Sequence, residues 1–212
     1  MINILCLETA TTNCSVSIFQ NEKLLAAKED NDNGYSHAEK LHVFIEELLS
    51  ENNISTEELS AVAVSSGPGS YTGLRIGVST AKGICYSLGI PLISVPTLGS
   101  LAKKVDDSES FIIPMLDARR MEVYASGYDS DGKELFPTRS EILTDSSFQN
   151  FLDLKKVYFI GSGTLKFQEI CEHPNALFVH HQLPSSKEMG VVAFSKFKKE
   201  DFEDVAYYEP FT

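Results

Sequence analysis

The 212-residue sequence lacks any long hydrophobic run, and no stretch approaches the ~18 apolar residues that a membrane-spanning helix requires. The N-terminal segment has no basic residue before its first apolar run, and it reaches an acid at Glu8. Both features are untypical of a signal peptide. We therefore expect a cytoplasmic protein that makes no membrane contact.

Basic residues are scarce relative to acidic ones. Lys and Arg total 18 against 30 Asp and Glu, so the formal net charge is −12. The imbalance is strongest in residues 1–60, where 11 acids and 3 bases give a net charge of −8. Because phosphate neutralisation needs Lys and Arg, this composition excludes an autonomous nucleic-acid binder. If the protein acts on nucleic acid, we expect another protein to hold it.

Cysteine is rare as well, with four residues in mostly apolar surroundings and no Cys-x-x-Cys motif. This pattern favours reduced, buried thiols over disulfides or metal ligands. The histidines give no metal motif either. His37 and His42 would lie ~140° apart around a helix, and the adjacent His180 and His181 would point in opposite directions on a strand. We expect no metal site.

Alternation and helical periodicity predict two similar halves. Each half begins with an apolar strand that ends in an acid, followed by a turn, an alternating strand, a second turn and a third strand. Helices and strands then alternate. We place the first lobe at 1–105 and the second at 106–212, with the last residues packing back on the first lobe. Predicted strands are 2–7, 14–20, 23–29, 61–65, 92–95, 111–116, 121–128, one from 133, and 157–160; predicted helices are 38–50, 72–88, 97–105, 146–152, 164–172 and 186–200.

A glycine-rich segment at 65–77 joins a predicted strand to the helix over 72–88. Such a loop can hold a phosphate on helix N–H groups. However, Leu74 stands where a Walker A motif needs Lys, and Thr72 stands where a dinucleotide motif needs its third glycine. The alternative, which we favour, is a tight strand-to-helix turn capped by Ser70 or Thr72.

Both long N-terminal helices are amphipathic. In 38–50 the apolar positions follow helical spacing from Leu41 to Leu49, and Ser36 with Glu39 predicts a capping box. The helix at 72–88 is apolar on more than one face, and it has a strip of small residues at Gly73, Gly77 and Ala81. Either its own lobe covers every face, or a partner helix packs on one of them.

Two acids stand at equivalent places, because Glu8 and Asp117 each end the first strand of a lobe. Two such carboxylates in a cleft can hold a metal–nucleotide complex or act as acid and base. They can equally accept hydrogen bonds from the N–H groups of the turns that follow, which is the reading we favour. Arg119 and Arg120 can bind an anion, although solvated or paired arginines are more common.

Several of these segments together resemble the bacterial TsaB (YeaZ) family. They are Glu8-Thr9-Ala10, the helix start at 36–41, the stretch 66–77 and the segment 117–124, which reads Asp-Ala-Arg-Arg-Met-Glu-Val-Tyr. The resemblance implies an α/β protein with the actin-like ATPase (ribonuclease H-like) fold, in which two duplicated lobes each contain a mixed sheet flanked by helices. Residues 207–212 depart from the Pro-x-Tyr-Leu-Arg tail usual in that family.

The resemblance also implies a function. Members of that family are accessory, non-catalytic subunits in the synthesis of N6-threonylcarbamoyladenosine in tRNAs that read codons beginning with A. They pair with the catalytic paralogue TsaD, are joined by the ATPase TsaE, form homodimers in isolation, and meet tRNA only through the complex. The implied partner interface lies on the helices at 38–50 and 72–88, at Leu41, Phe44, Ile45, Leu48, Tyr71, Leu74, Arg75, Val78, Ala81 and Cys85.

The remaining candidate positions form a vestigial cleft with no resident cofactor and at most weak nucleotide binding. They are Glu8, Thr9, Gly67, Gly69, Asp117 and Arg119. Two other functions stay open. One is an ATP-binding phosphotransferase or ATPase that uses Glu8 and Asp117. The other is a glycoprotease of the M22 group, which the missing zincin helix disfavours.

Overall fold

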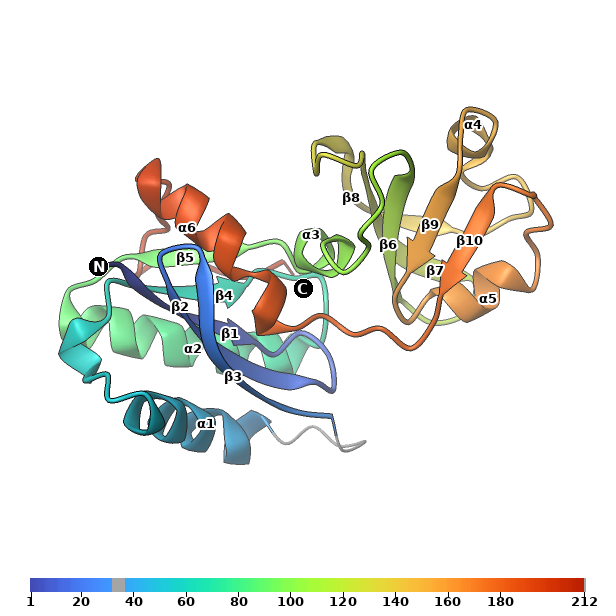
Figure 1. Ribbon diagram of the computed structural model, residues 1–212. Helices are drawn as coiled ribbons and strands as arrows, with labels where there is room; N and C mark the ends of the chain where they lie inside the picture. The colour runs from blue at the N-terminus through green and yellow to red at the C-terminus, as the bar shows by residue number, and fades with distance from the viewer. Residues whose placement is uncertain (32–36, 212) are drawn as a thin grey trace. The chain divides into compact units, whose positions relative to one another are not determined.

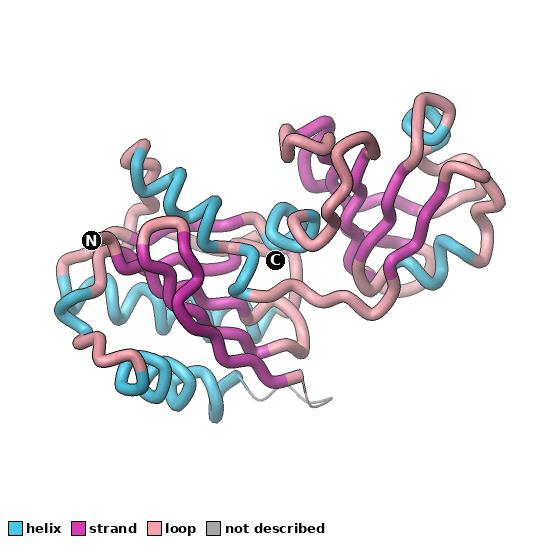
Figure 2. Tube along the Cα trace, viewed as in Figure 1, coloured by secondary structure: helices cyan, strands magenta, loops and turns pink. Residues whose placement is uncertain are grey.

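The computed structural model describes residues 1–31 and 37–211. The chain divides into two units, Met1–Ser100 with Pro184–Thr212 and Leu101–Leu183. It leaves unit 1 within helix α3 (Thr97–Ala102) and returns through a loop at residues 180–185 (Figure 2). Each unit is described by itself.

Unit 1 is a five-stranded mixed sheet between helices, in the order β3-β2-β1-β4-β5. Its strands are β1 (Asn3–Glu8), β2 (Cys14–Gln20), β3 (Lys23–Asp30), β4 (Ala61–Ser65) and β5 (Leu92–Val95). The first three strands are antiparallel, and β4 and β5 continue parallel to β1. Figure 1 shows α1 (His37–Glu51) and α2 (Tyr71–Leu88) on one face and α6 (Gly190–Lys198) on the other. A short turn of 3₁₀-helix, η1 (Thr56–Glu58), precedes β4.

The period-two alternation of the central strands builds the core of unit 1 on both faces of the sheet. In β1, Leu5 and Leu7 pack toward α1 and α2, whereas Ile4 and Cys6 pack toward α6. All four side chains are fully buried. This explains why β1 reads as a continuous apolar run, since both of its faces are covered.

Unit 2 repeats the topology of unit 1 in the order β10-β9-β6-β7-β8. Its strands are β6 (Phe111–Asp117), β7 (Glu122–Tyr128), β8 (Glu134–Ile142), β9 (Val157–Ile160) and β10 (Ala176–Val179), and its helices are α4 (Gln149–Leu152) and α5 (Thr164–Gln168). Strands β6, β7 and β8 are antiparallel, and β9 and β10 run parallel to β6. A cluster of phenylalanines fills the core, with the rings of Phe159 and Phe167 4.8 Å apart.

The predicted duplication is therefore confirmed, whereas three details of the prediction need correction. The last residues do pack back on the first lobe, but the segment that does so is longer than a terminal tail: it begins at Pro184, and Met189 and Ala193 pack on the outer face of the first sheet. Strand β10 was not expected, since its four residues are half-buried and carry no alternation. The helices predicted at 146–152, 164–172 and 186–200 are shorter, at 149–152, 164–168 and 190–198.

The four cysteines are free and buried, as predicted. Burial raises the pKa of the Cys6 thiol to about 12 and that of Cys14 and Cys85 to about 11, which disfavours the thiolate form at neutral pH. The predicted cap at Ser36 lies outside the described residues. Among those described, no helix combines the length and the apolar character needed to cross a bilayer.

Candidate functional site

Glu8 ends β1 at the centre of the first sheet, where its side chain is 0% exposed. One carboxylate oxygen, Oε1, accepts a hydrogen bond of 2.7 Å from the N–H of Ala10. The other oxygen, Oε2, is buried, and no described residue forms a hydrogen bond with it. Burial raises the pKa of Glu8 to about 7, and the Glu188 carboxylate adds to the rise, whereas hydrogen bonds from Ala10 and Ser65 oppose it. Glu8 thus closes the turn after β1, the structural role that the sequence favoured.

The turn after β1 lies directly against α2. A Cβ atom at Gly69 would come within 2.4 Å of the Ala10 carbonyl oxygen, and one at Gly73 within 2.2 Å of the Thr9 carbonyl oxygen. At Gly77 it would meet the hydroxyl of Thr9 at 2.3 Å. The two glycines of the small-residue strip on α2, Gly73 and Gly77, therefore accommodate Thr9 of the same chain, and not a partner helix as we considered from the sequence.

The glycine-rich loop before α2 donates its N–H groups within unit 1. The Gly67 N–H donates to the Thr97 hydroxyl at 3.0 Å, and the Ser70 N–H donates to the Ala10 carbonyl at 2.6 Å. The Ser70 hydroxyl caps α2 by accepting from the Gly73 N–H at 3.2 Å, which confirms the predicted cap. The favoured reading as a capped turn agrees with this geometry, since these three N–H groups do not point at an open phosphate cradle.

The C-terminal segment covers the same loop. The Phe211 N–H donates to the Ser66 carbonyl at 2.8 Å, and the Phe211 carbonyl oxygen lies 1.9 Å from where a Cβ of Gly67 would be. Gly67 has φ of +94°, which favours glycine independently. Farther along the segment, Lys82 of α2 donates to the carbonyls of Ala206 and Tyr208 at 2.9 and 3.1 Å. No local pattern in the sequence predicted this anchor, because more than 120 residues separate the partners.

The predicted partner interface on α1 and α2 needs a correction. Seven of its ten side chains are buried, and six of these belong to the core between the helices and the sheet, because they form the apolar face that each helix turns to its own core. They are Leu41, Ile45, Leu48, Leu74, Val78, Ala81 and Cys85. Phe44 is half-buried, and only Tyr71 and Arg75 are exposed.

The exposed side of the two helices nevertheless holds a groove. Its volume is about 520 Å³, and its lining mixes small and apolar side chains with the Tyr71 ring and three hydroxyl-bearing residues of α2. Tyr71 is 57% exposed, and the Arg75 guanidinium lies over its ring at 4.3 Å from the centroid. We call this feature the α1–α2 groove; it is lined by Ala38, His42, Tyr71, Thr72, Arg75, Ile76, Ser79 and Thr80.

In unit 2, Asp117 ends β6 as Glu8 ends β1. Its Oδ1 accepts from the Arg119 N–H at 2.6 Å, two residues along, and from Lys166 Nζ at 3.2 Å. Unlike Glu8, Asp117 is exposed. Both carboxylates thus stabilise the turn after the first strand, and each does so within its own unit. Lys166, which also donates to the carbonyls of Arg120 and Glu122, was missed from the sequence because α5 is 44 or more residues away.

The histidines are engaged singly. His37 Nε2 lies 2.7 Å from the Thr11 carbonyl oxygen, His42 lines the α1–α2 groove, and His180 Nδ1 lies 2.9 Å from the Thr164 hydroxyl. Burial lowers the pKa of His37. Within residues 1–31 and 37–211, no three His, Cys, Asp or Glu side chains are grouped so that they could hold a metal ion.

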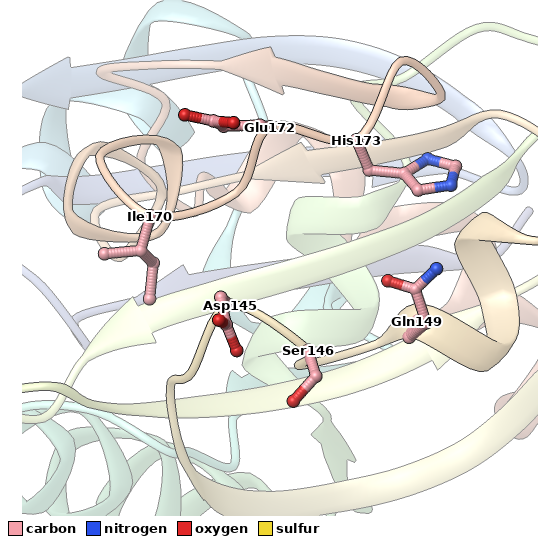
Figure 3. A pocket seen from close by; sticks show the side chains of 6 residues that line it. All are labelled: Asp145, Ser146, Gln149, Ile170, Glu172 and His173. Atoms are coloured by element: carbon pink, nitrogen blue, oxygen red, sulfur yellow. The ribbon is translucent and has the colours of Figure 1, made fainter.

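Unit 2 also has a polar hollow of about 580 Å³, which no sequence motif predicted. His173, at its rim, lies 3.6 Å from a carboxylate oxygen of Asp153. Figure 3 shows its side chains spread around the rim and not converging on one point. They belong to Asp145, Ser146, Gln149, Ile170, Glu172 and His173.

Comparison with solved structures identifies the fold class of the chain. A ROK hexokinase from Thermus thermophilus superposes with a TM-score of 0.52 at 12% identity, over 93% of this chain and all of that one. YeaZ from Pseudomonas aeruginosa superposes with a TM-score of 0.83 at 22% identity over the full length of both chains. The two repeated mixed sheets with flanking helices define the actin-like ATPase fold, as expected.

Sequence comparison gives the family. A family model described as "TsaD: tRNA N6-adenosine threonylcarbamoyltransferase" matches residues 32–208. The "tRNA threonylcarbamoyladenosine biosynthesis protein TsaB" of Escherichia coli is 30% identical over 99% of this chain and 93% of its own length. The chain therefore belongs to the TsaD family, in its TsaB branch.

Proposed function

We propose that this protein is a non-catalytic subunit that binds and activates a TsaD-like transferase in the synthesis of N6-threonylcarbamoyladenosine in tRNAs that read codons beginning with A. The α1–α2 groove carries the proposal, because it presents the exposed Tyr71 ring and apolar side chains from two adjacent helices. Exposed aromatic and arginine side chains around a hollow are typical anchors of a protein interface.

The geometry of unit 1 supports the non-catalytic part of the proposal. The N–H groups of Gly67, Ser70 and Gly73 donate within the chain, and Oε1 of Glu8 accepts from Ala10. A phosphate-transferring site needs such groups aimed at substrate.

The α1–α2 groove also serves as the homodimer contact in isolation, so that homodimer and heterodimer compete. A TsaE-like ATPase joins the heterodimer, tRNA is held by the assembled complex, and the complex is cytoplasmic.

Co-expression with the TsaD-like protein of the same organism tests the proposal. The variant pair Tyr71→Asp with Arg75→Glu changes two exposed groove residues. Ile142→Asp, on an exposed side chain of β8, is the matched control. We expect the groove variant to lose co-purification and the formation of threonylcarbamoyladenosine, and the control to retain both. Equal binding by the groove variant and the wild type would overturn the groove as the interface.

The variants must be chosen from the exposed side of the helices. Leu74 and Val78 are buried in the core, so replacing either by Glu would unfold unit 1 and not test binding.

The competing ATPase function has its own test, which is calorimetry of the isolated chain with Mg-ATP. Micromolar binding that disappears in Glu8→Ala would favour that function. Stoichiometric zinc or iron bound through His37 or His42 would favour the peptidase.

A further inference from the structure

The turn between β6 and β7 carries two consecutive arginines in an unusual backbone conformation. Arg119 has φ of +74° and Arg120 has φ of +46°, and both residues are exposed. This left-handed region is costly for side chains other than those of Gly, Asn and Asp. A turn selected only for stability would therefore carry Asn or Gly at these positions.

Three hydrogen-bond donors and one carboxylate hold this turn in place. Asp117 Oδ1 accepts from the Arg119 N–H, and Lys166 Nζ donates to Asp117 Oδ1 at 3.2 Å and to the Arg120 carbonyl at 2.8 Å. The Asp117 N–H in turn donates to the Ser162 hydroxyl at 3.1 Å. The charge of Lys166 thus balances that of Asp117, and the backbone of both arginines is anchored to β6 and α5.

The guanidinium groups of this turn remain unneutralised. Of the four arginines in the sequence, Arg75 lies over the Tyr71 ring, and Arg139 pairs with Glu141 at 3.0 Å. Throughout the described residues, neither Arg119 nor Arg120 pairs with a carboxylate or stacks on a ring. The turn therefore presents two adjacent guanidinium charges in a chain with a net charge of −12.

The position of the turn fits a ligand site. Asp117 and Ile160 end the parallel strands β6 and β9, and the carboxyl-end edge of a parallel sheet is where α/β proteins bind ligands. The guanidinium fork matches two oxygens of one phosphate group. A fixed backbone also lowers the entropy lost when such a side chain binds.

We propose that the Arg119–Arg120 turn contacts phosphate groups of the tRNA backbone in the assembled complex. The inference rests on the proposed function, which brings this acidic chain next to a tRNA. Two guanidinium groups neutralise about two phosphates, so the contact adds to affinity through counterion release without reading sequence. The strained backbone is then the cost of presenting both charges at one edge of the sheet.

The test is a titration of the complex with an unmodified tRNA transcript at several salt concentrations. Arg119→Asn with Arg120→Asn removes both charges and keeps a residue that tolerates positive φ. We expect the slope of log affinity against log salt to become shallower by about 1.4 to 1.8, and the affinity at low salt to fall on the order of tenfold. Arg119→Lys with Arg120→Lys retains the charges and most of the slope.

A matched control removes two charges from the opposite edge of the same sheet. Lys155 and Lys156 precede β9, whose first residue, Val157, pairs with Phe111 at the start of β6. Lys155→Asn with Lys156→Asn leaves the salt slope unchanged if the arginine turn is specific. An equal loss in both double variants would show a nonspecific charge effect and overturn the proposal.

Two further outcomes separate this inference from the proposed function. An unchanged salt slope in Arg119→Asn with Arg120→Asn, in a complex whose activity still requires this subunit, overturns the arginine contact alone. So does binding of ATP or inorganic phosphate to the isolated chain that depends on Arg119 and Arg120 while tRNA affinity is unchanged. A transferase that works equally well without this subunit overturns the proposed function itself.

Discussion

Glu8 and Asp117 occupy equivalent positions in the two units, but they differ in burial and in their charged partners. Each ends the first strand of its sheet, and each accepts from the N–H two residues along the chain. Asp117 is exposed and paired with Lys166, whereas Glu8 is fully buried and its Oε2 has no hydrogen-bond partner within residues 1–31 and 37–211. Burying an unpaired carboxylate oxygen costs free energy, and the cost is lower when the carboxyl group is protonated.

This difference predicts a pH dependence of stability that originates at Glu8. The pKa of Glu8 is raised in the folded state to about 7, from 4.5, so its protonated form is favoured by folding. The contribution is complete below pH ~4.5 and is lost as the pH rises through ~7. Relative to Glu8→Gln, the wild type should lose on the order of 3 kcal/mol across this range.

Denaturant unfolding of both proteins between pH 4.5 and 8 measures this difference. The gap between wild type and Glu8→Gln should widen up to pH ~7 and then stay constant. Exposed groups that are common to both proteins cancel in the comparison. Parallel stability curves over the whole range would contradict a raised pKa at Glu8.

Helix α2 contributes both to the core of unit 1 and to the proposed partner interface. One face carries Gly73 and Gly77 against the Thr9–Ala10 turn, and a second face carries Val78, Ala81 and Cys85 against the sheet. The third face is exposed from Tyr71 to Tyr86, which is 85% exposed. A helix that is apolar on two faces thus has both of them covered by its own unit, and only the third is available to a partner.

Two glycine substitutions in α2 test this assignment of faces. Gly73→Ala places a Cβ 2.2 Å from the Thr9 carbonyl oxygen, and backbone cannot move aside as a side chain can. We expect a loss of roughly 2 to 3 kcal/mol of unfolding free energy, the range typical of overpacking. Gly83→Ala meets nothing within 4 Å and should stabilise the helix by roughly 0.5 to 1 kcal/mol.

Thermal or denaturant unfolding of the two alanine variants gives the comparison directly. Both changes have the same helix propensity, so the difference between them reports the contact with the β1–β2 turn. Equal stability of the two variants would show that the β1–β2 turn moves to make room for the added Cβ. Glycine would then not be required at position 73.

At the scale of the whole molecule, the charge is distributed unevenly. Residues 1–60 carry a net charge of −8, and α1, which borders the groove, lies within them. Part of this charge is paired, since Glu47 and Glu51 both contact Lys28 at 2.7 Å. Glu39 and Glu46 of α1 are exposed, so we infer that the groove attracts a basic surface on its partner.

This charge predicts how fast the subunits associate. The association rate constant with the proposed TsaD-like partner should fall several-fold between ~20 and ~300 mM salt, and the dissociation rate constant should change little. Glu46→Lys, which reverses one exposed charge, should reduce the salt dependence. Stopped-flow or surface-based kinetics measures both constants. An association rate that is insensitive to salt would contradict the electrostatic argument.

Much of the architecture was predictable because local patterns and tertiary structure agree. Both halves begin with an apolar strand, an alternating strand and a tight turn, as in β1, β2 and the turn at 129–132. The observed sheets have the same topology. Strand β10 was missed because its burial is intermediate and unpatterned. The packing of the last residues on the first lobe was expected, but its start at Pro184 was not, because no local pattern marks where the chain returns to the first sheet.

The sequence by itself determined the fold class, the duplication, the family and the presence of amphipathic helices, since all of these depend on periodicity and on short motifs. Only the tertiary structure decided which helix faces are free. The apolar face of a helix has the same sequence pattern whether it packs on a sheet or on a partner. In α2 this face packs on the sheet, because the Thr9–Ala10 turn fits against the glycines of the helix. The same holds for Arg119 and Arg120, whose exposed turn is set by Lys166, 46 or more residues away.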